Sequence, residues 1–359
     1  MRDYSRLSAS GDGVKRESAG DLSRFSPLVM PTLLVATLVL SLSLGRYTIS
    51  PMRVLTVLWE SLRSILVPGS TATIEGTART VVLAVRLPRV LTAMLVGAAL
   101  ATSGATLQGL FRNPLVSPGI LGVSSGAGLG ASLAILLVGF QAWVVQFSAF
   151  LFGMGAVVLV MLISGSSRKT SMLMMVLAGV IVGALAEASI SLVKFVADPE
   201  DTLPAIVYWL MGSLAGVTAD SLRRVAPPIV AGVGLLIAMR WRINLLSLGD
   251  SDAQSLGVNV GASRWIAISA ATITTAAAVS VAGVVGWVGL VVPHMSRMIV
   301  GADHRRLLPF SAAFGAVYLA LIDNLARNLT TGEIPLGILN ALVGAPFFAV
   351  LLRRTGGGW

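Results

Sequence analysis

Long apolar runs without a charged residue constrain the fold of this chain more than any other feature. They cover residues 27–45, 90–111, 113–167, 225–239, 265–293 and 307–322. A helix needs roughly 20 apolar residues to cross a hydrocarbon core of about 30 Å. Only 12% of the residues are charged, against about 25% in an ordinary soluble domain. The sequence therefore predicts an all-α, polytopic integral membrane protein.

The apolar runs predict about ten transmembrane helices. Two of the runs exceed the length of one helix and are divided at residues 139–141 and 283–286, where glycine makes a break inexpensive. Ten spans would place both termini on the same side of the membrane. The expected helices are 28–45, 90–111, 118–139, 142–164, 172–197, 225–241, 264–283, 286–300, 308–326 and 336–352.

The two ends of the chain are expected to lie outside this bundle. Residues 1–24 are mixed in charge and rich in Ser and Gly, unlike a cleaved signal peptide, and the apolar run that follows predicts a retained first helix. The expected organisation is a flexible cytoplasmic tail over 1–26, a ten-helix transmembrane domain over 27–354, and a cytoplasmic C-terminal tail over 355–359.

The distribution of basic residues predicts the orientation in the membrane. With both termini in the cytoplasm, 16 of the 26 Lys and Arg residues fall on the inside, and the outer segment 198–220 has four acids and no base. This agrees with the positive-inside rule and predicts a multi-pass membrane protein with both termini in the cytoplasm. It also explains the net charge of +10 without a nucleic-acid partner. The segment from Arg46 to Arg89 breaks the rule, because it places six arginines outside.

Several kinds of chemistry are excluded by composition. The chain has no cysteine and two histidines, so we expect no metal site and no cofactor. A phosphate loop ends in Gly-Lys-Ser/Thr, and none of the three lysines follows a glycine. The chain is therefore not an ATPase. An ion-coupled transporter that uses Glu187 or Asp323 remains the alternative class, although Asp323 lies one helical turn before Arg327 and is suited to an i,i+4 ion pair.

Two short elements interrupt the pattern of spans. In the loop 245–264, Asp250 or Ser251 can cap a two-turn helix that Gly257 can end. Such a helix suits the docking of a cytosolic partner, and a plain connector is the alternative. On the outer side, 203–217 is apolar but too short to cross. It predicts a re-entrant helix that lines a vestibule with Tyr208 and Trp209, or an interfacial aromatic anchor.

Four long motifs, taken in order along the chain, resemble one family of membrane proteins. They are RLPRVLTAMLVGAALATSGATLQGLFRNPLVSPGILGVSSGAGLGA (86–131), LSLGDSDAQSLGV (246–258), GWVGLVVPHMSRMIVGADHRRLLP (286–309) and IPLGILNALVGAPFFAVLLRR (334–354). They are similar to the FecCD/BtuC-type permeases, the membrane subunits of type II ABC importers for ferric siderophores, haem and vitamin B12. The resemblance implies a homodimer in a bacterial plasma membrane, with two cytosolic ABC ATPase subunits and an extracytoplasmic solute-binding protein.

The resemblance also implies roles for particular residues. The arginines that dock the binding protein match Arg86, Arg89 and Arg327, for which snorkelling to lipid headgroups is the alternative. The resemblance further implies a cytoplasmic gate at Asn113 and Leu115, with Thr170 and Ser171 as the nearest hydroxyls of a second gate. It also implies an ATPase-coupling loop that contains Gly249, Asp250, Ala253, Leu256 and Gly257.

The sequence does not specify the solute. The resemblance implies an iron chelate or a similar bulky solute, such as a ferric siderophore, haem or vitamin B12. An oxyanion such as molybdate is the alternative within the same family. The segment ADPEDTLPAIVYWLMGSL (197–214) is a variant that does not assign a solute.

Overall fold

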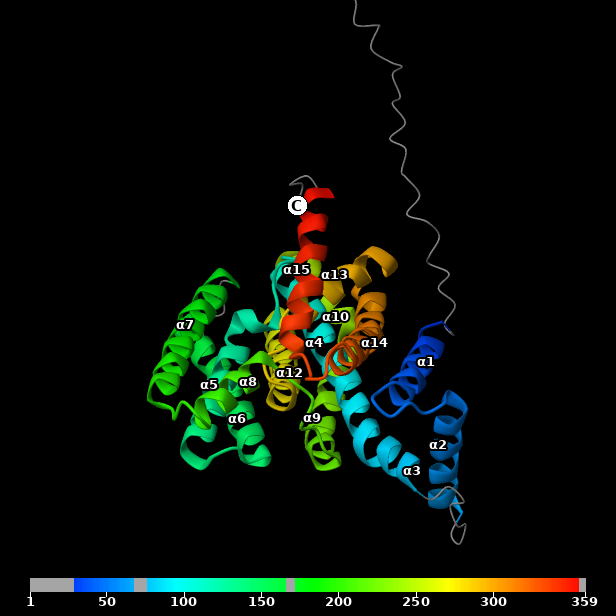
Figure 1. The fold of residues 1–359 in the computed structure, drawn as a ribbon. Coiled ribbons are helices and arrows are strands. Elements are labelled where there is room, and N and C mark those ends of the chain that lie inside the picture. The colour runs from blue at the N-terminus through cyan, green and yellow to red at the C-terminus, as the bar shows by residue number, and fades with distance from the viewer. Residues whose placement is uncertain (1–28, 68–75, 166–171, 355–359) are drawn as a thin grey trace, which may run out of the picture.

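The computed structural model describes residues 29–67, 76–165 and 172–354, and within them every regular element is a helix (Figure 1). The elements are α1 (Val29–Ser43), α2 (Pro51–Leu66), α3 (Thr77–Thr80), η2 (Val81–Arg86), α4 (Leu87–Phe111), η3 (Pro118–Leu121), α5 (Val123–Val138), α6 (Ala142–Ser164), α7 (Met172–Val196), α8 (Thr202–Met211), α9 (Ala219–Ala238), α10 (Arg240–Leu248), α11 (Asp250–Ser255), α12 (Val260–Ala282), α13 (Val288–Val300), α14 (His304–Asn328) and α15 (Leu336–Arg354).

The membrane-spanning architecture predicted from the sequence is confirmed. Among the described residues, six helices are long and apolar enough to cross a bilayer: the continuous helix from α3 to α4, and α6, α7, α9, α12 and α14. Four shorter apolar helices, α1, α5, α13 and α15, match the other four predicted spans. In Figure 1, α15 extends to the top of the molecule and α1 lies at the side of the bundle, beside α14. The predicted tails over 1–26 and 355–359 lie outside the described residues.

Two helices were missed by the sequence analysis. α2 begins at the cap residue Ser50, whose hydroxyl accepts a hydrogen bond from the Arg53 amide, and Pro51 occupies the first turn. Its 16 residues include three charged side chains, so a search for uncharged runs does not find it. α10 follows α9 almost without a break and begins with two arginines among its first three residues.

The first long span also begins earlier than predicted. The helix was expected at residue 90, but it is continuous from Thr77 and passes through a π-helical stretch. Arg86 and Arg89 were expected to end the apolar span. They do not end the helix, because both find bonding partners within the chain.

α4 lies at the centre of the bundle and packs through small residues. A Cβ at Gly97 would overlap the carbonyl of Gly315 in α14, and one at Gly104 would overlap the carbonyl of Gly289 in α13. Close backbone approach of this kind is how helices associate in lipid, where no hydrophobic effect drives them together. The structure thus explains the small-residue segment 97–105 and fixes α4 as the element against which both polar ends of the protein are built.

Candidate functional site at the two ends of helix α4

Polar and charged side chains gather at both ends of α4. With a rise of 1.5 Å per residue, its 25 residues span about 37 Å, so the two groups lie on opposite sides of the bundle. We call the group at the N-terminal end the arginine cluster: Arg46, Arg86, Arg89, Asp323, Asn324, Arg327 and Glu333. The group at the C-terminal end consists of the turn that follows α4 and the coupling loop that contains α11.

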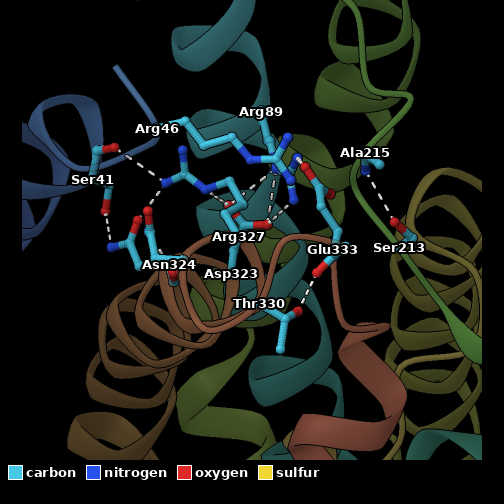
Figure 2. Close-up of polar contacts among 12 residues, drawn as sticks. Ser41, Arg46, Arg89, Ser213, Ala215, Asp323, Asn324, Arg327, Thr330 and Glu333 are labelled. Carbon is cyan, nitrogen blue, oxygen red and sulfur yellow. Dashed lines mark hydrogen bonds and ion pairs between the residues drawn. The ribbon is translucent and has the colours of Figure 1, made fainter. Parts of the chain in front are cut away.

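Asp323 is the central acid of the arginine cluster (Figure 2). Its Oδ1 accepts hydrogen bonds from Nε and Nη2 of Arg89 at 3.0 and 2.8 Å, and its Oδ2 lies 3.1 Å from Nε of Arg327. Arg89 also donates through Nη1 to Oε1 of Glu333 at 2.8 Å. The Asp323 side chain is 1% exposed. A carboxylate buried to this degree needs paired cations to offset its lost hydration, and two arginines supply them.

The ion pair expected between Asp323 and Arg327 is therefore confirmed. Asp323 is already paired with two arginines, which leaves it poorly suited to the ion-coupling role of the alternative transporter class. The other candidate for that role is Glu187, and the structure does not bury it within the single chain. Glu187 lies exposed on α7. The buried residues of α7 lie on the side that packs against α5 and α6, and Glu187 lies outside this packed side.

Arg86 holds the turn between α1 and α2. Its Nη1 donates to the carbonyl oxygens of Leu42 and Ser43 at 2.7 and 3.1 Å, and its Nη2 donates to the carbonyl oxygen of Tyr47. Gly45 packs directly on the guanidinium, with φ +152°, and a Cβ at this position would overlap Arg86. A guanidinium has five N–H donors and no acceptor, so it can organise several carbonyls at once. Arg86 is 5% exposed.

Arg327 connects α14 to the end of α1. It donates to the Ser41 carbonyl oxygen at 3.2 Å and to Oδ1 of Asn324, while Nδ2 of Asn324 donates to the Ser41 hydroxyl at 2.7 Å. The structure thus brings together Arg86, Arg89 and Arg327, which the sequence grouped by resemblance, and all three are buried. Their docking role stays a prediction. Their partner Glu333 was missed, since nothing in the sequence places it beside α4.

Arg46 differs from the other arginines of the cluster, and the sequence analysis did not single it out. It is exposed, and its guanidinium donates to the carbonyl oxygen of Thr331. It lies at an open hollow of about 560 Å³ at the surface of the cluster. The residues that line this hollow are Arg46, Arg327, Asn328, Leu329, Thr330 and Thr331.

At the other end, α4 stops in a fixed turn. Arg112 adopts a left-handed conformation with φ 51°, and the Asn113 amide donates to the Gln108 carbonyl at 3.1 Å. Oδ1 of Asn113 accepts from the Leu115 amide at 2.9 Å. The two predicted gate residues, Asn113 and Leu115, are therefore placed side by side on an exposed turn, with Leu115 50% exposed. Thr170 and Ser171, the predicted second gate, lie outside the described residues.

The coupling loop contains the predicted short helix, α11, which follows Gly249 and precedes Gly257. The φ of +80° at Gly257 is the left-handed conformation expected for the residue that ends the helix. The predicted cap is wrong: neither Asp250 nor Ser251 caps α11, because Gly249, with φ +150°, holds the cap position and makes no side-chain bond. Within the loop, Ala253 is fully buried and Leu256 is exposed.

Asp250 joins the coupling loop to the turn after α4. Its Oδ1 accepts from Nη2 of Arg264, at the start of α12, at 2.7 Å. The same oxygen lies 3.8 Å from Nη2 of Arg112. Asp250, the first residue of α11, therefore links this helix to α12 and to the turn that carries Asn113 and Leu115. The ion pairs were not predicted, because they depend on tertiary placement.

The short helix α8 ends at Met211, earlier than the predicted 203–217. The Tyr208 hydroxyl lies 3.0 Å from Oγ of Ser213. Oγ of Ser213 also accepts a hydrogen bond from the Ala215 amide (Figure 2). Tyr208 and Trp209 both line a cavity of about 80 Å³. The vestibule role of these two aromatic residues stays a prediction.

The fold and the two polar ends define a class, a polytopic membrane permease without an ATPase motif of its own. Residues 33–354 match the model of the FecCD transport family, and the chain belongs to this family. It is therefore the membrane subunit of an ABC importer, in which a separate subunit supplies ATP hydrolysis.

Curated relatives extend over most of the chain. The molybdate import system permease protein MolB of Haemophilus influenzae is 44% identical and covers 90% of this chain and 93% of its own. The cobalamin import system permease protein BtuC of Halobacterium salinarum is 43% identical over 78% and 75% of the two chains. The hemin transport system permease protein HmuU of Yersinia pestis is 40% identical over 75% and 82%.

A solved structure supports the fold. The chain is similar to an inward-facing conformation of a putative metal-chelate type ABC transporter, with a TM-score of 0.80 and 43% identity over 90% of this chain and 97% of that one.

Proposed function

We propose that this chain, as a homodimer, forms the translocation pathway of an importer completed by two cytosolic ABC ATPases and an extracytoplasmic solute-binding protein. The observation that carries the proposal is the coupling loop. A short helix with an exposed Leu256 is held at a fixed angle by the buried Ala253 and by the Asp250–Arg264 pair. A simple connector between α10 and α12 would need neither the helix nor the ion pair.

The proposed topology places the coupling loop and both termini in the cytoplasm and the arginine cluster on the outside. The positive-inside distribution supports it. The segment 46–89 then has six arginines on the outside, against the positive-inside rule. Two of them, Arg86 and Arg89, are buried and form hydrogen bonds within this chain. The arginine cluster is the face on which we propose that the binding protein docks.

We further propose that Asp250 transmits movement of the ATPase to the gate. A force on α11 moves the Asp250 carboxylate, which is bonded to α12 and lies next to Arg112. Arg112 directly precedes Asn113, so a displacement there turns the predicted gate residues. The link is short and polar, and all of its residues lie within the part of the chain that the structure describes.

For the solute, we propose a metal chelate or similar bulky compound, the chemistry named for the cobalamin and hemin relatives. An oxyanion is the second candidate, favoured by the molybdate relative, which is 44% identical over 90% of the chain. Titration calorimetry of the binding protein that associates with this permease, against molybdate, a ferric siderophore, haem and cobalamin, distinguishes them. Tight binding of molybdate alone would replace the first candidate by the second.

A further inference from the structure

A hollow between three of the membrane-spanning helices combines an apolar wall with one arginine that has no acidic partner. We propose that this hollow binds one anionic phospholipid, with its phosphate on Arg224 and an acyl chain along the apolar wall. The inference goes beyond the proposed import of a solute and does not depend on which solute is carried. Under the proposed topology the site faces the outer leaflet of the bilayer.

The hollow lies where α6 and α9 begin and where α12 ends. Its volume is about 330 Å³, within the range of about 300–1,000 Å³ that is usual for small-molecule sites. Both α6 and α9 pack against α12, but within the part of the chain that the structure describes they have little direct contact with each other. A molecule in the hollow would therefore bridge α6 and α9.

The wall of the hollow is apolar and runs along the helices. Trp143, Phe147 and Phe150 line it from one side of α6, and the first two are each 61% exposed. Val225 and Pro228 line it from α9. Tryptophan is typical of the level of the lipid headgroups, and α6 rises about 10 Å from Trp143 to Phe150. The wall therefore extends from the headgroups towards the acyl chains, as a bound phospholipid requires.

The polar end of the hollow has a positive charge without a carboxylate. Nε of Arg224 donates to Oε1 of Gln146 at 3.1 Å, and Nη2 donates to Oγ of Ser221 at 3.3 Å. Among the described residues no acid forms an ion pair with Arg224, whereas the preceding Arg223 is paired with Asp220 at 3.2 Å. A guanidinium has five N–H donors, so three remain for a phosphate, which arginine can bind through two oxygens.

The backbone beside Arg224 adds a hydrogen-bond acceptor. Pro227 and Pro228 lie inside α9, and proline has no amide hydrogen. In an α-helix the amide of each residue bonds the carbonyl four residues earlier, so the carbonyls of Arg223 and Arg224 lack this partner. A headgroup that carries hydroxyls can donate to them. Phosphatidylglycerol combines such hydroxyls with a net negative charge, and basic pockets between transmembrane helices bind anionic headgroups.

The test measures fluorescence quenching by brominated lipids. The chain has no cysteine, so Leu151→Cys provides a single site for the fluorophore bimane. Leu151 is exposed, lies one turn from Phe147 on the same side of α6, and does not line the hollow. The labelled permease is reconstituted in mixtures of phosphatidylglycerol and phosphatidylcholine in which one or the other lipid is brominated. We expect roughly a fivefold preference for phosphatidylglycerol, the effect of one basic residue on an anionic headgroup.

Arg224→Gln, in the labelled permease, should remove this preference. The matched control is Arg223→Gln, which also removes one charge but changes a residue that is paired with Asp220 and does not line the hollow. It should leave the preference unchanged. Arg224→Lys keeps the charge and should retain a reduced preference, which separates loss of the charge from loss of the bond to Gln146. Size-exclusion profiles of the variants show that each is folded.

Several results would overturn the proposal. Equal quenching by the two lipids in the wild type would show that the hollow does not select an anionic headgroup. An equal loss of preference in Arg223→Gln and Arg224→Gln would assign it to general surface charge. If glycerol 3-phosphate in the buffer removed the preference, a free phosphate would be the ligand. Weak quenching by both lipids would mean that a second copy of the chain covers the hollow.

Discussion

The two ends of α4 are built from similar residues in opposite ways. At the arginine cluster, Asp323 is 1% exposed and lies within 3.1 Å of two arginines. At the coupling loop, Asp250 is 45% exposed, with one arginine at 2.7 Å and another at 3.8 Å. A buried pair costs much to separate, whereas an exposed pair contributes about 0.2–1 kcal/mol. The first arrangement fixes helices to one another, and the second can be made and broken as the protein moves.

The buried charges therefore stabilise the fold, whereas the exposed charges are available for function. In the arginine cluster, buried ion pairs hold α4 to α14, and buried hydrogen bonds from Asn324 and Arg327 hold α14 to the end of α1. In the coupling loop, the exposed Asp250 is itself the link between moving parts. We therefore expect substitutions of the buried charges to lower stability, and substitutions of the exposed charges to change transport.

The largest expected effect is on stability at the buried end. Replacing Asp323 by Asn removes the charge that both Arg89 and Arg327 face, and leaves two guanidinium groups buried without a counter-charge. Loss of one partner of a buried ion pair costs about 3–5 kcal/mol. We expect a sharply lower folded yield and melting temperature, measured by fluorescence-detected size exclusion after heating. A variant as stable as the wild type would show that the cluster does not hold the helices.

An intermediate effect is expected at Gly257. Its φ of +80° disfavours a β-branched residue, and Gly257→Val should cost roughly 1 kcal/mol or more in the local fold of the loop. A Cβ at this position meets open space, so membrane insertion should be retained while association with the ATPase weakens. Co-purification of the two subunits measures this. Normal association and full transport would mean that the loop is only a connector.

A smaller effect on stability, with a distinct functional signature, is expected at Asp250. Asp250→Asn and Arg112→Gln should each change the melting temperature little, since the pair is largely exposed. Both should lower the amount of solute transported per ATP hydrolysed, and the double variant should lose no more than Asp250→Asn alone, because that variant already removes the link to Arg112.

Asp252→Asn serves as the control for that experiment. Asp252 lies on the same short helix and is exposed, and it forms no ion pair among the described residues. It should leave the ratio of transport to hydrolysis unchanged. If the Asp252 and Asp250 variants behaved alike, general charge on α11 and not the specific link would explain the effect.

The sequence predicted what depends on composition and local pattern. The ten apolar helices follow from uncharged apolar runs, and the short coupling helix and its Gly257 end follow from residue type; the structure confirms them. The helix α2 was missed because it is amphipathic and carries charges, and a search for uncharged runs passes over it.

The arrangement of the arginines could not be predicted, because burial of a charge depends on partners far away in the chain. Arg89 meets acids 234 and 244 residues away. Nothing local distinguishes it from Arg46, which remains exposed. The sequence indicated correctly that this segment contains too many arginines for its side of the membrane. Which of them are structural becomes visible only when α1, α4 and α14 are in place.

The central claim is that this chain transports only together with an ATPase and a binding protein, and one reconstitution tests it most directly. The permease is placed in liposomes alone with a proton or sodium gradient, and in parallel with both partners and ATP, using radioactive molybdate and a radioactive ferric siderophore as probes. We predict accumulation of at least one probe in the complete system with ATP, and none with the permease alone. Accumulation by the permease alone, driven by the ion gradient and abolished by Glu187→Gln, would contradict the account.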